Sequence, residues 1–548
     1  MSVTSVTGKS ISLNIPRPVG LGISAPRSWR LSSWFLLVAA LTVAGLMLLT
    51  PTYLLIRTAG SGQAALDILL KPTTLTALWN TVLLAGSVSL ASAVLAVPIA
   101  WLTVCTDLPG RRFWTVAASL PLVLPSFVVA YLLASVLGPR GIAQGLLYPL
   151  TGIERLPNIY GFPGAFLVLT LMSYPFTLLS VRAALRRMDP SLIEAARSLG
   201  LSPWQAFRRV TLPHLKPAIV AGSLLIALYV LRDYGAVTMM RYNTFTRIIY
   251  IQYQTIMDRS LAASLALVLI GMTAAILYFE FRTRGRAHYT RRSAGAARQM
   301  RQVKLGRWRY PALLFIGSVV LVALVMPAAG LGYWLWRGLA GTQTLASLWQ
   351  PAAHSVGVSL ATAGVTIAAA LPVVVLSVRR PGRMSHLVER LTYAGFALPG
   401  IVIALALVFF GATYARSLYQ TWGMLLVAYV ILFIPQAVGA ARASLLQIPT
   451  CLEEAGRSLG RRPLDVFRKI TLPLLGPGIF AGAALVFLTA MKELPATLIL
   501  SPAGFRTLAT AVWGSIAEAF FAQAAAPALL LILLSSLPLA LLTLREEK

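Results

Sequence analysis

The sequence EAARSLGLSPWQAFRRVTLPHLKPAIVAG occupies residues 194–222, and a second copy, EAGRSLGRRPLDVFRKITLPLLGPGIFAG, occupies residues 454–482. The two copies share 17 of 29 aligned residues at an offset of 260 residues. Upstream of them the offset is 274, which pairs Pro98 with Pro372 and Pro125 with Pro399. Self-similarity that extends over such a distance predicts two copies of one structural unit.

The regions around both copies are strongly apolar. Of 548 residues, 57% are hydrophobic and 11% are charged, whereas a soluble globular chain carries about 25% charged residues. This composition excludes a water-soluble enzyme, a disordered chain and a fibrous repeat. Twelve stretches are long and apolar enough to cross a bilayer as helices: 33–56, 80–104, 114–137, 162–181, 217–237, 261–281, 311–336, 355–378, 391–412, 422–441, 477–499 and 524–544.

We therefore predict an all-α polytopic membrane protein with about 12 transmembrane helices in two six-helix repeats. Equivalent segments are separated by six spans, so they lie on the same side of the membrane and the repeat is parallel. The expected organisation is a basic tail at 1–32, a first unit at 33–281 with its core from about 70, a linker at 282–310, and a second unit at 311–548 with its core from about 350.

Basic residues orient the predicted spans. With the N-terminus in the cytoplasm, 35 of the 47 Lys and Arg residues lie in cytoplasmic segments, as the positive-inside rule requires. We expect both termini in the cytoplasm. Because the basic residues lie between apolar blocks, the net charge of +31 favours contact with membrane lipid over nucleic acid.

Each repeated loop has the signals of two short packed helices. In the first copy Asp189-Pro190 begins one helix and Gly200 ends it, then Ser202-Pro203 begins another and Pro213 is expected to stop it. Ala195-Ala196 and Ala455-Gly456 predict a small-residue face that another protein can approach closely. Two such loops on the cytoplasmic side predict docking surfaces for two partner subunits.

The two loops resemble the EAA motif of permease subunits of binding-protein-dependent ABC importers. The matching residues are Glu194, Ala195, Ala196, Gly200, Leu212 and Pro213 in the first copy, and Glu454, Ala455, Gly456, Gly460, Leu472 and Pro473 in the second. The resemblance implies a fused, two-unit permease with the type I ABC importer fold. It further implies that the loops couple to two ABC ATPase subunits and that a periplasmic solute-binding protein delivers the solute. The expected location is the inner membrane of a bacterium.

Residues 491–497 (MKELPAT), 505–510 (FRTLAT) and 233–235 (DYG) resemble the ferric-iron branch of these permeases. Ferric iron is therefore the expected solute, and thiamine, phosphonate or another small solute is the alternative within the family. A 12-span ion-coupled secondary transporter is the alternative from another class. It accounts for the span count but gives no reason for a duplicated, capped loop.

The sequence contains no phosphate-binding loop of the form G-x-x-x-x-G-K-[ST], so we expect a transport subunit that is not an enzyme and depends on partners for ATP hydrolysis. No bound cofactor or metal site is expected. Charged residues inside spans are costly in a membrane and are candidates for a translocation path: Arg232, Asp233 with the adjacent Tyr234, Lys492 and Glu493. A structural role, in which each charged pair ties its helix to a neighbour, is the open alternative.

Overall fold

The computed structural model describes residues 27–60, 62, 63, 67, 70–254, 259–284, 303–340 and 348–546. In these residues every regular element is a helix, apart from an isolated bridge between Thr106 and Val303. In the described part of the chain, eleven helices are long and apolar enough to cross a membrane, and a bent helix pair can form a twelfth span. These features confirm the all-α polytopic prediction. Most of the expected tail and linker, at 1–26 and 285–302, lie outside the described residues.

The repeat extends through the whole order of elements. The first half contains α1 (Arg27–Ala59), α3 (Pro72–Cys105), α4 (Arg111–Ala117), η1 (Leu120–Val123), α5 (Ser126–Leu137), α6 (Ile142–Thr151), α7 (Phe162–Arg187), α8 (Pro190–Ser198), α9 (Pro203–Ala206), η2 (Phe207–Thr211), α10 (Leu212–Arg232), α11 (Gly235–Met239), α12 (Phe245–Gln254) and α13 (Arg259–Arg284).

The second half contains η3 (Gly306–Trp308), α14 (Arg309–Val320), η4 (Leu321–Val325), α15 (Met326–Ala340), α16 (Trp349–Arg379), α17 (Arg383–Tyr393), η6 (Ala394–Ala397), α18 (Gly400–Tyr414), α19 (Trp422–Leu445), α20 (Thr450–Ser458), α21 (Pro463–Val466), η7 (Phe467–Thr471), α22 (Leu472–Met491), α23 (Pro495–Leu500), α24 (Leu508–Ala517) and α25 (Phe521–Glu546). From α3 and α16 onward the two orders match, except that α6 occurs only in the first half.

The third and ninth predicted spans are interrupted helices. The expected third span, 114–137, breaks between α4 and α5, and the ninth bends by 107° between α17 and α18. Pro125 and Pro399 occupy the N-cap positions of α5 and α18 with extended backbone. A proline disfavours helical conformation in the residue before it and lacks an N–H group, so each span ends one helix and starts another at this point.

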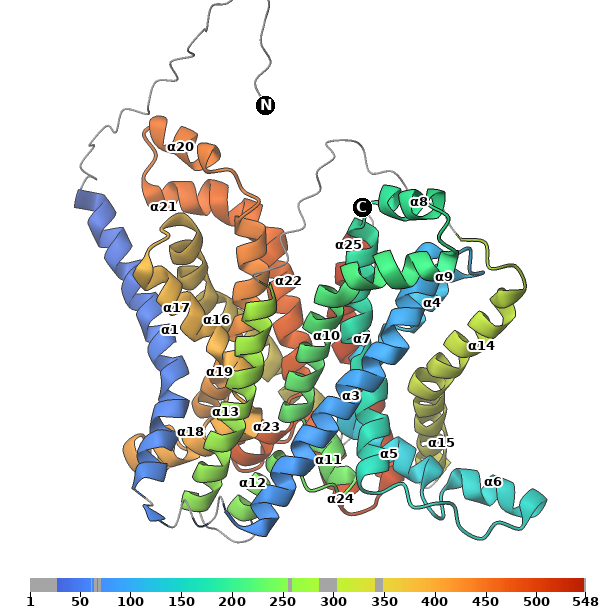
Figure 1. Cartoon of the computed structure of the whole chain (residues 1–548). Helices are drawn as coiled ribbons and strands as arrows, with labels where there is room; N and C mark the ends of the chain where they lie inside the picture. Colours follow the sequence, from blue (N-terminus) through green and yellow to red (C-terminus); the bar gives the residue numbers. More distant parts are fainter. Residues whose placement is uncertain are drawn as a thin grey trace, which may run out of the picture.

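The first membrane helix of each half packs against the other half. Helix α1 contacts α16, α17 and α18 of the second half in addition to α13 of its own half, and α15 contacts α5 of the first half in addition to α25 of its own half. In Figure 1, α1 lies beside α16 and α17, and α14 and α15 lie at the opposite side of the molecule near α4 and α5. The first helices are therefore exchanged in part, because each packs on the other half as well as on its own.

The segment that leads into α14 is also attached to the first half. The Val303 backbone N–H donates to the carbonyl oxygen of Cys105 at 2.8 Å, and the Asp107 N–H donates to the carbonyl oxygen of Val303 at 3.2 Å. The Leu305 N–H donates to Oδ1 of Asp107 at 2.8 Å. These three bonds fix the start of α14 beside the end of α3, where the exchanged helix must begin.

The two halves meet near the ends of α10 and α22. One hydrophobic cluster combines Tyr234 and Val237 of the first half with Val402, Met491 and Trp513 of the second. At the other end of the molecule α8 and α9 lie well apart from α20 and α21, as Figure 1 shows. The ends of α10 and α22 therefore meet at the side away from the repeated loops, whereas the two hairpins themselves lie apart.

Candidate functional site

The repeated loop of the first half is a helical hairpin made of α8 and α9. The Asp189 carboxylate accepts a hydrogen bond from the Ser191 N–H at 3.0 Å, and Pro190 is the first helical residue, as predicted. Gly200 follows the helix with a φ of +85°, a conformation that glycine adopts without strain. At the start of the next helix, α9, the Ser202 N–H donates to Oε1 of Gln205 at 3.0 Å. Local sequence signals therefore fix the shape of the hairpin.

The prediction that Pro213 stops the second helix of the hairpin is wrong. Helix α9 continues through the π-helical segment η2 directly into α10, and α21 continues through η7 into α22 in the same way. In η2 the Leu212 N–H donates to the carbonyl oxygen of Phe207, five residues earlier. This wider turn accommodates Pro213, which has no N–H to donate, so each hairpin is joined to a membrane helix without a break.

The two small residues of each motif face different ways. Ala195 and Ala455 are exposed, whereas Ala196 and Gly456 are buried. A Cβ atom on Gly456 would lie 2.7 Å from Cδ1 of Ile470, a residue of the same hairpin. The prediction of a small-residue face open to a partner is therefore wrong for Ala196 and Gly456, because these residues let the two helices of one hairpin pack together.

The same packing accounts for the single departure from the motif. A Cβ atom on Gly456 would also lie 3.2 Å from Cγ2 of Val466. At the 260-residue offset Val466 and Ile470 correspond to the smaller Ala206 and Val210. The first hairpin has the smaller neighbours and an alanine, whereas the larger neighbours in the second hairpin favour glycine.

The outer surface of each hairpin combines an acid with a prominent leucine. Glu194 and Glu454 are exposed. Leu199 is 84% exposed and Leu459 is 81% exposed, each directly before the glycine that ends its helix. One exposed leucine is ordinary on a protein surface, but its recurrence at the same place on both hairpins, beside an exposed acid, makes each tip a candidate contact surface.

Sequence reasoning missed Glu453, which precedes the motif acid of the second hairpin. Its side chain is buried, and its Oε1 accepts hydrogen bonds from Nε of Arg379 at 2.9 Å and from Oγ1 of Thr471 at 3.1 Å. Nη2 of Arg457 lies 3.5 Å from its Oε2. The motif drew attention to Glu454, and the adjacent acid has no periodic or motif signal of its own.

The charged pairs expected inside continuous spans lie at helix ends. Arg232 is the last residue of α10, and Lys492 directly follows α22, so these membrane helices end short of the predicted residues 237 and 499. The Asp233 carboxylate accepts hydrogen bonds from the Ala236 N–H at 2.9 Å and from the Ser126 hydroxyl. The membrane helix ends here because the Asp233 carboxylate accepts hydrogen bonds from N–H groups that are otherwise free at the start of the next helix.

Glu493 has the equivalent position in the second half. Its Oε1 accepts a hydrogen bond from the Ala496 N–H at 3.1 Å, at the start of α23. Asp233 and Glu493 therefore act as the same kind of cap on α11 and α23. This gives a definite structural role to both acids and leaves the two neighbouring cations to interact elsewhere.

Those cations connect the two halves. Nζ of Lys492 donates to the carbonyl oxygen of Leu122 at 3.1 Å, and Arg232 interacts electrostatically with Glu493. The ring centroids of Tyr234 and Trp513 are 5.3 Å apart, which adds an aromatic contact between the halves. Arg232, Tyr234, Lys492 and Glu493 are thus brought together at the interface between the units.

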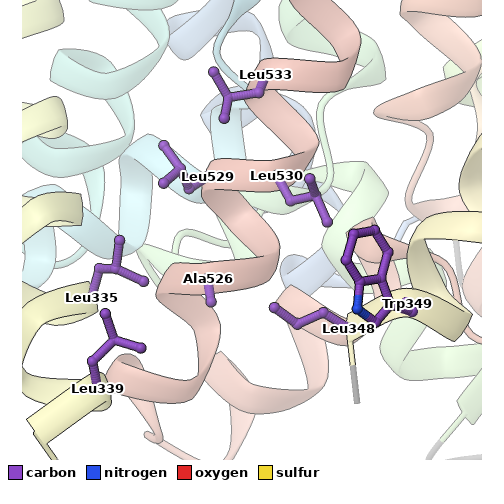
Figure 2. Close-up of a pocket in the computed structure, with 8 residues that line it drawn as sticks. All are labelled: Leu335, Leu339, Leu348, Trp349, Ala526, Leu529, Leu530 and Leu533. Carbon is purple, nitrogen blue, oxygen red and sulfur yellow. The ribbon is translucent and has the colours of Figure 1, made fainter. Parts of the chain in front are cut away.

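A cavity of about 290 Å³ lies between α15, the start of α16 and α25. Figure 2 shows that its labelled side chains are all apolar apart from the indole nitrogen of Trp349: Leu335, Leu339, Leu348, Trp349, Ala526, Leu529, Leu530 and Leu533. Such a lining offers no ligands to a metal ion or a polar solute. Within the described part of the chain, no group of three or more His, Cys, Asp or Glu residues is placed to hold a metal.

Comparison with known proteins assigns the family. Residues 92–284 and 374–547 each match the family described as binding-protein-dependent transport system inner membrane component. The Fe(3+)-transport system permease protein FbpB 2 of Haemophilus influenzae is 35% identical over 93% of this chain and 98% of that protein. The probable ABC transporter permease protein y4fN of Sinorhizobium fredii is 26% identical over 86% and 87%, respectively.

The molybdenum transport system permease protein ModB of Escherichia coli is 34% identical over 35% of this chain and 88% of that protein. A relative that corresponds to a single unit, together with two separate family matches, agrees with the fused repeat. The assignment also removes the alternative of an ion-coupled secondary transporter. The chain belongs to the family of binding-protein-dependent transport system inner membrane components, and it is a fused, two-unit permease subunit of a type I ABC importer.

Proposed function

We propose that this chain forms the membrane pathway of an ATP-driven importer of ferric iron. Two ATPase subunits bind the hairpins α8–α9 and α20–α21, and a periplasmic binding protein delivers the solute to the opposite side. The chain itself binds no cofactor and hydrolyses no ATP. Both of its termini lie in the cytoplasm, on the side of the hairpins, as the distribution of basic residues supports.

The observation that carries the proposal is the pair of matching, exposed hairpins, each continuous with a membrane helix. The chain runs without a break from α9 through η2 into α10, and from α21 through η7 into α22. A displacement of a hairpin by a bound partner is therefore transmitted to the helix that ends at Arg232 or Met491. Coupling follows if the ATPase subunits bind the two states of the permease with different affinity.

The interface between the halves is the proposed gate on the far side of the membrane. In this arrangement the path is closed by Lys492 bonded to the Leu122 carbonyl, by Arg232 near Glu493, and by Tyr234 against Trp513. The hairpins are apart while this interface is closed (Figure 1). Movement of the hairpins toward each other would separate these contacts and open the path to the binding protein.

Ferric iron is favoured by the Haemophilus influenzae relative, because its similarity extends over nearly the full length of both chains. The resemblance at residues 491–497 supports the same solute. Other relatives are named for molybdenum and sulfate transport, so molybdate and sulfate serve as comparison solutes beside thiamine and phosphonate. Stimulation of ATP hydrolysis by one of them, and not by ferric iron, would overturn the solute but leave the importer class intact.

The docking role is tested with the double variant Glu194→Lys and Glu454→Lys. We expect uptake of radioactive ferric citrate by cells to be lost while the amount of inserted protein stays unchanged, since charge reversal on both hairpins opposes binding to a basic partner surface. Glu518→Lys, an exposed acid beyond α24, is the matched control and should keep uptake. Undiminished uptake by the double variant would contradict docking at these hairpins.

Partner number is tested by purification. Extraction of the whole importer in a mild detergent should yield two ATPase subunits for each copy of this chain, because the chain carries two hairpins. Recovery of a single ATPase subunit with every chain, under conditions that preserve ATP-dependent uptake, would contradict the proposed arrangement.

A further inference from the structure

We propose that Glu453 is a positioning residue that ties the second coupling helix, α20, to the membrane helices, whereas the first coupling helix, α8, is attached less firmly. The two ATPase docking elements of this fused chain are then mechanically unequal, although their backbones match. The attachment itself is independent of the proposed function, and only its consequence for transport depends on ATPase docking at the hairpins.

The carboxylate of Glu453 lies at the centre of a small bonded network. Arg379, the last residue of α16, donates from Nε to Glu453 at 2.9 Å and from Nη2 to the carbonyl oxygen of Ile448 at 3.0 Å. Thr471 of η7 donates to the same carboxylate at 3.1 Å, and Arg457 of α20 lies 3.5 Å from it. The network therefore joins a membrane helix, the coupling helix and the segment that leads into α22.

The first half lacks the charged partners of this network. At the 260-residue offset Glu453 corresponds to Ile193, and at the 274-residue offset Arg379 corresponds to Cys105, which is likewise the last residue of its helix. Arg197 and Thr211 are retained at the positions of Arg457 and Thr471. An ion pair in the second half is thus replaced by two uncharged side chains in the first.

A second ion pair follows the same pattern. Nε of Arg442 on α19 lies 2.9 Å from Oε1 of Glu389 on α17. The corresponding residues of the first half are Arg182 and Thr115, so the acid is again missing. At both of these positions the second half has an ion pair and the first half has lost at least one charged partner, so the difference is not confined to one residue.

Burial makes the Glu453 network strong enough to matter. The Glu453 side chain is 8% exposed and the Arg379 side chain 15% exposed, so both ions are mostly removed from water. Removing one partner of a buried ion pair leaves an unpaired charge, and this costs far more than loss of an exposed pair. Local opening of α20 must break this network, whereas opening of α8 breaks no ion pair at the position of Glu453.

Hydrogen–deuterium exchange on the full chain in lipid nanodiscs, without ATPase subunits, measures this difference. We expect the amides of α20 to exchange about tenfold or more slowly than those of α8. In the variant Glu453→Ile, which installs the residue of the first half, the exchange of α20 should rise to the rate of α8. Equal exchange of both helices in the unmodified chain would overturn the proposal.

Two further variants distinguish attachment from general damage. Glu454→Gln neutralises the neighbouring exposed acid and should leave the exchange of α20 unchanged. The pair Cys105→Arg and Ile193→Glu transplants the network into the first half and should slow the exchange of α8. Glu453→Gln keeps the side-chain volume but removes the charge. Faster exchange of the α20 amides in this variant would assign the attachment to charge, and unchanged exchange would overturn the role of the ion pair.

The consequence for transport is read separately from the attachment. With ATPase subunits present, Glu453→Gln should lower the amount of solute moved per ATP hydrolysed, while ATPase binding stays within about twofold of the unmodified chain. If the α20 amides exchange faster in Glu453→Gln but the amount of solute moved per ATP is unchanged, the attachment does not serve coupling. Loss of ATPase binding in the Glu194 and Glu454 variants tests docking and does not depend on this result.

Discussion

The leucines at the hairpin tips allow the docking role to be tested quantitatively. Leu199 is 84% exposed and Leu459 81% exposed, so nearly the whole side chain is available for burial against a partner. Full burial of a leucine is worth about 1.5–3 kcal/mol, and truncation to alanine would remove about 1–2 kcal/mol of it. Because each 1.4 kcal/mol is a factor of ten, each truncation should weaken ATPase binding about 5- to 30-fold.

The assay is a binding titration of purified ATPase subunit against the detergent-solubilised chain. Leu199→Ala and Leu459→Ala should each weaken one of the two binding sites, and the double variant should weaken both sites by these factors, because the hairpins are far apart and bind separate subunits. Leu387→Ala, a 50% exposed leucine on α17, is the matched control and should bind normally. The reasoning would be refuted if the double variant bound the ATPase subunit as tightly as the unmodified chain. The single variants and the double variant should keep the melting temperature of the unmodified chain, which shows that they are folded.

Two further predictions concern the membrane helices. A Cβ atom on Gly478 would lie 2.3 Å from Cβ of Ser444, whereas a Cβ atom on Gly476 would have no other atom within 4 Å. Gly478→Ala should therefore destabilise the protein by about 1–3 kcal/mol, and Gly476→Ala should not. Thermal unfolding in detergent measures the difference. Lys492→Met removes the hydrogen bond to the Leu122 carbonyl, so the closed state loses a contact of about 1.5–3 kcal/mol. ATP hydrolysis in the absence of solute should therefore rise severalfold. Equal melting temperatures of the two glycine variants, or unchanged basal hydrolysis, would count against these contacts.

The fold class and the repeat could be predicted from the sequence because both depend on long, regular signals. Apolar stretches of membrane length and 17 identities in 29 residues need no knowledge of tertiary contacts. The caps of α8 were predicted for the same reason, since Asp189, Pro190 and Gly200 act on neighbouring backbone atoms. The start and end of α8 were therefore predicted correctly.

Features that depend on which surfaces meet could not be predicted. The role of Pro213 was wrong because a π-turn can absorb a missing donor, and nothing in the sequence distinguishes that outcome from a helix end. The burial of Ala196 and Gly456 depends on residues 10–14 positions later in the hairpin. Glu453 was missed because its partner Arg379 lies 74 residues away, a pairing that one sequence does not indicate.

The exchange of α1 and α15 between the halves has a consequence for synthesis. A ribosome delivers α1 to the membrane about 300 residues before the helices α16 and α17 that it covers. Until then the apolar face of α1 must be shielded by lipid or by the insertion machinery, and neither half can mature alone. A gene cut between the halves would therefore encode two fragments that acquire their native shape only when both are made in the same cell.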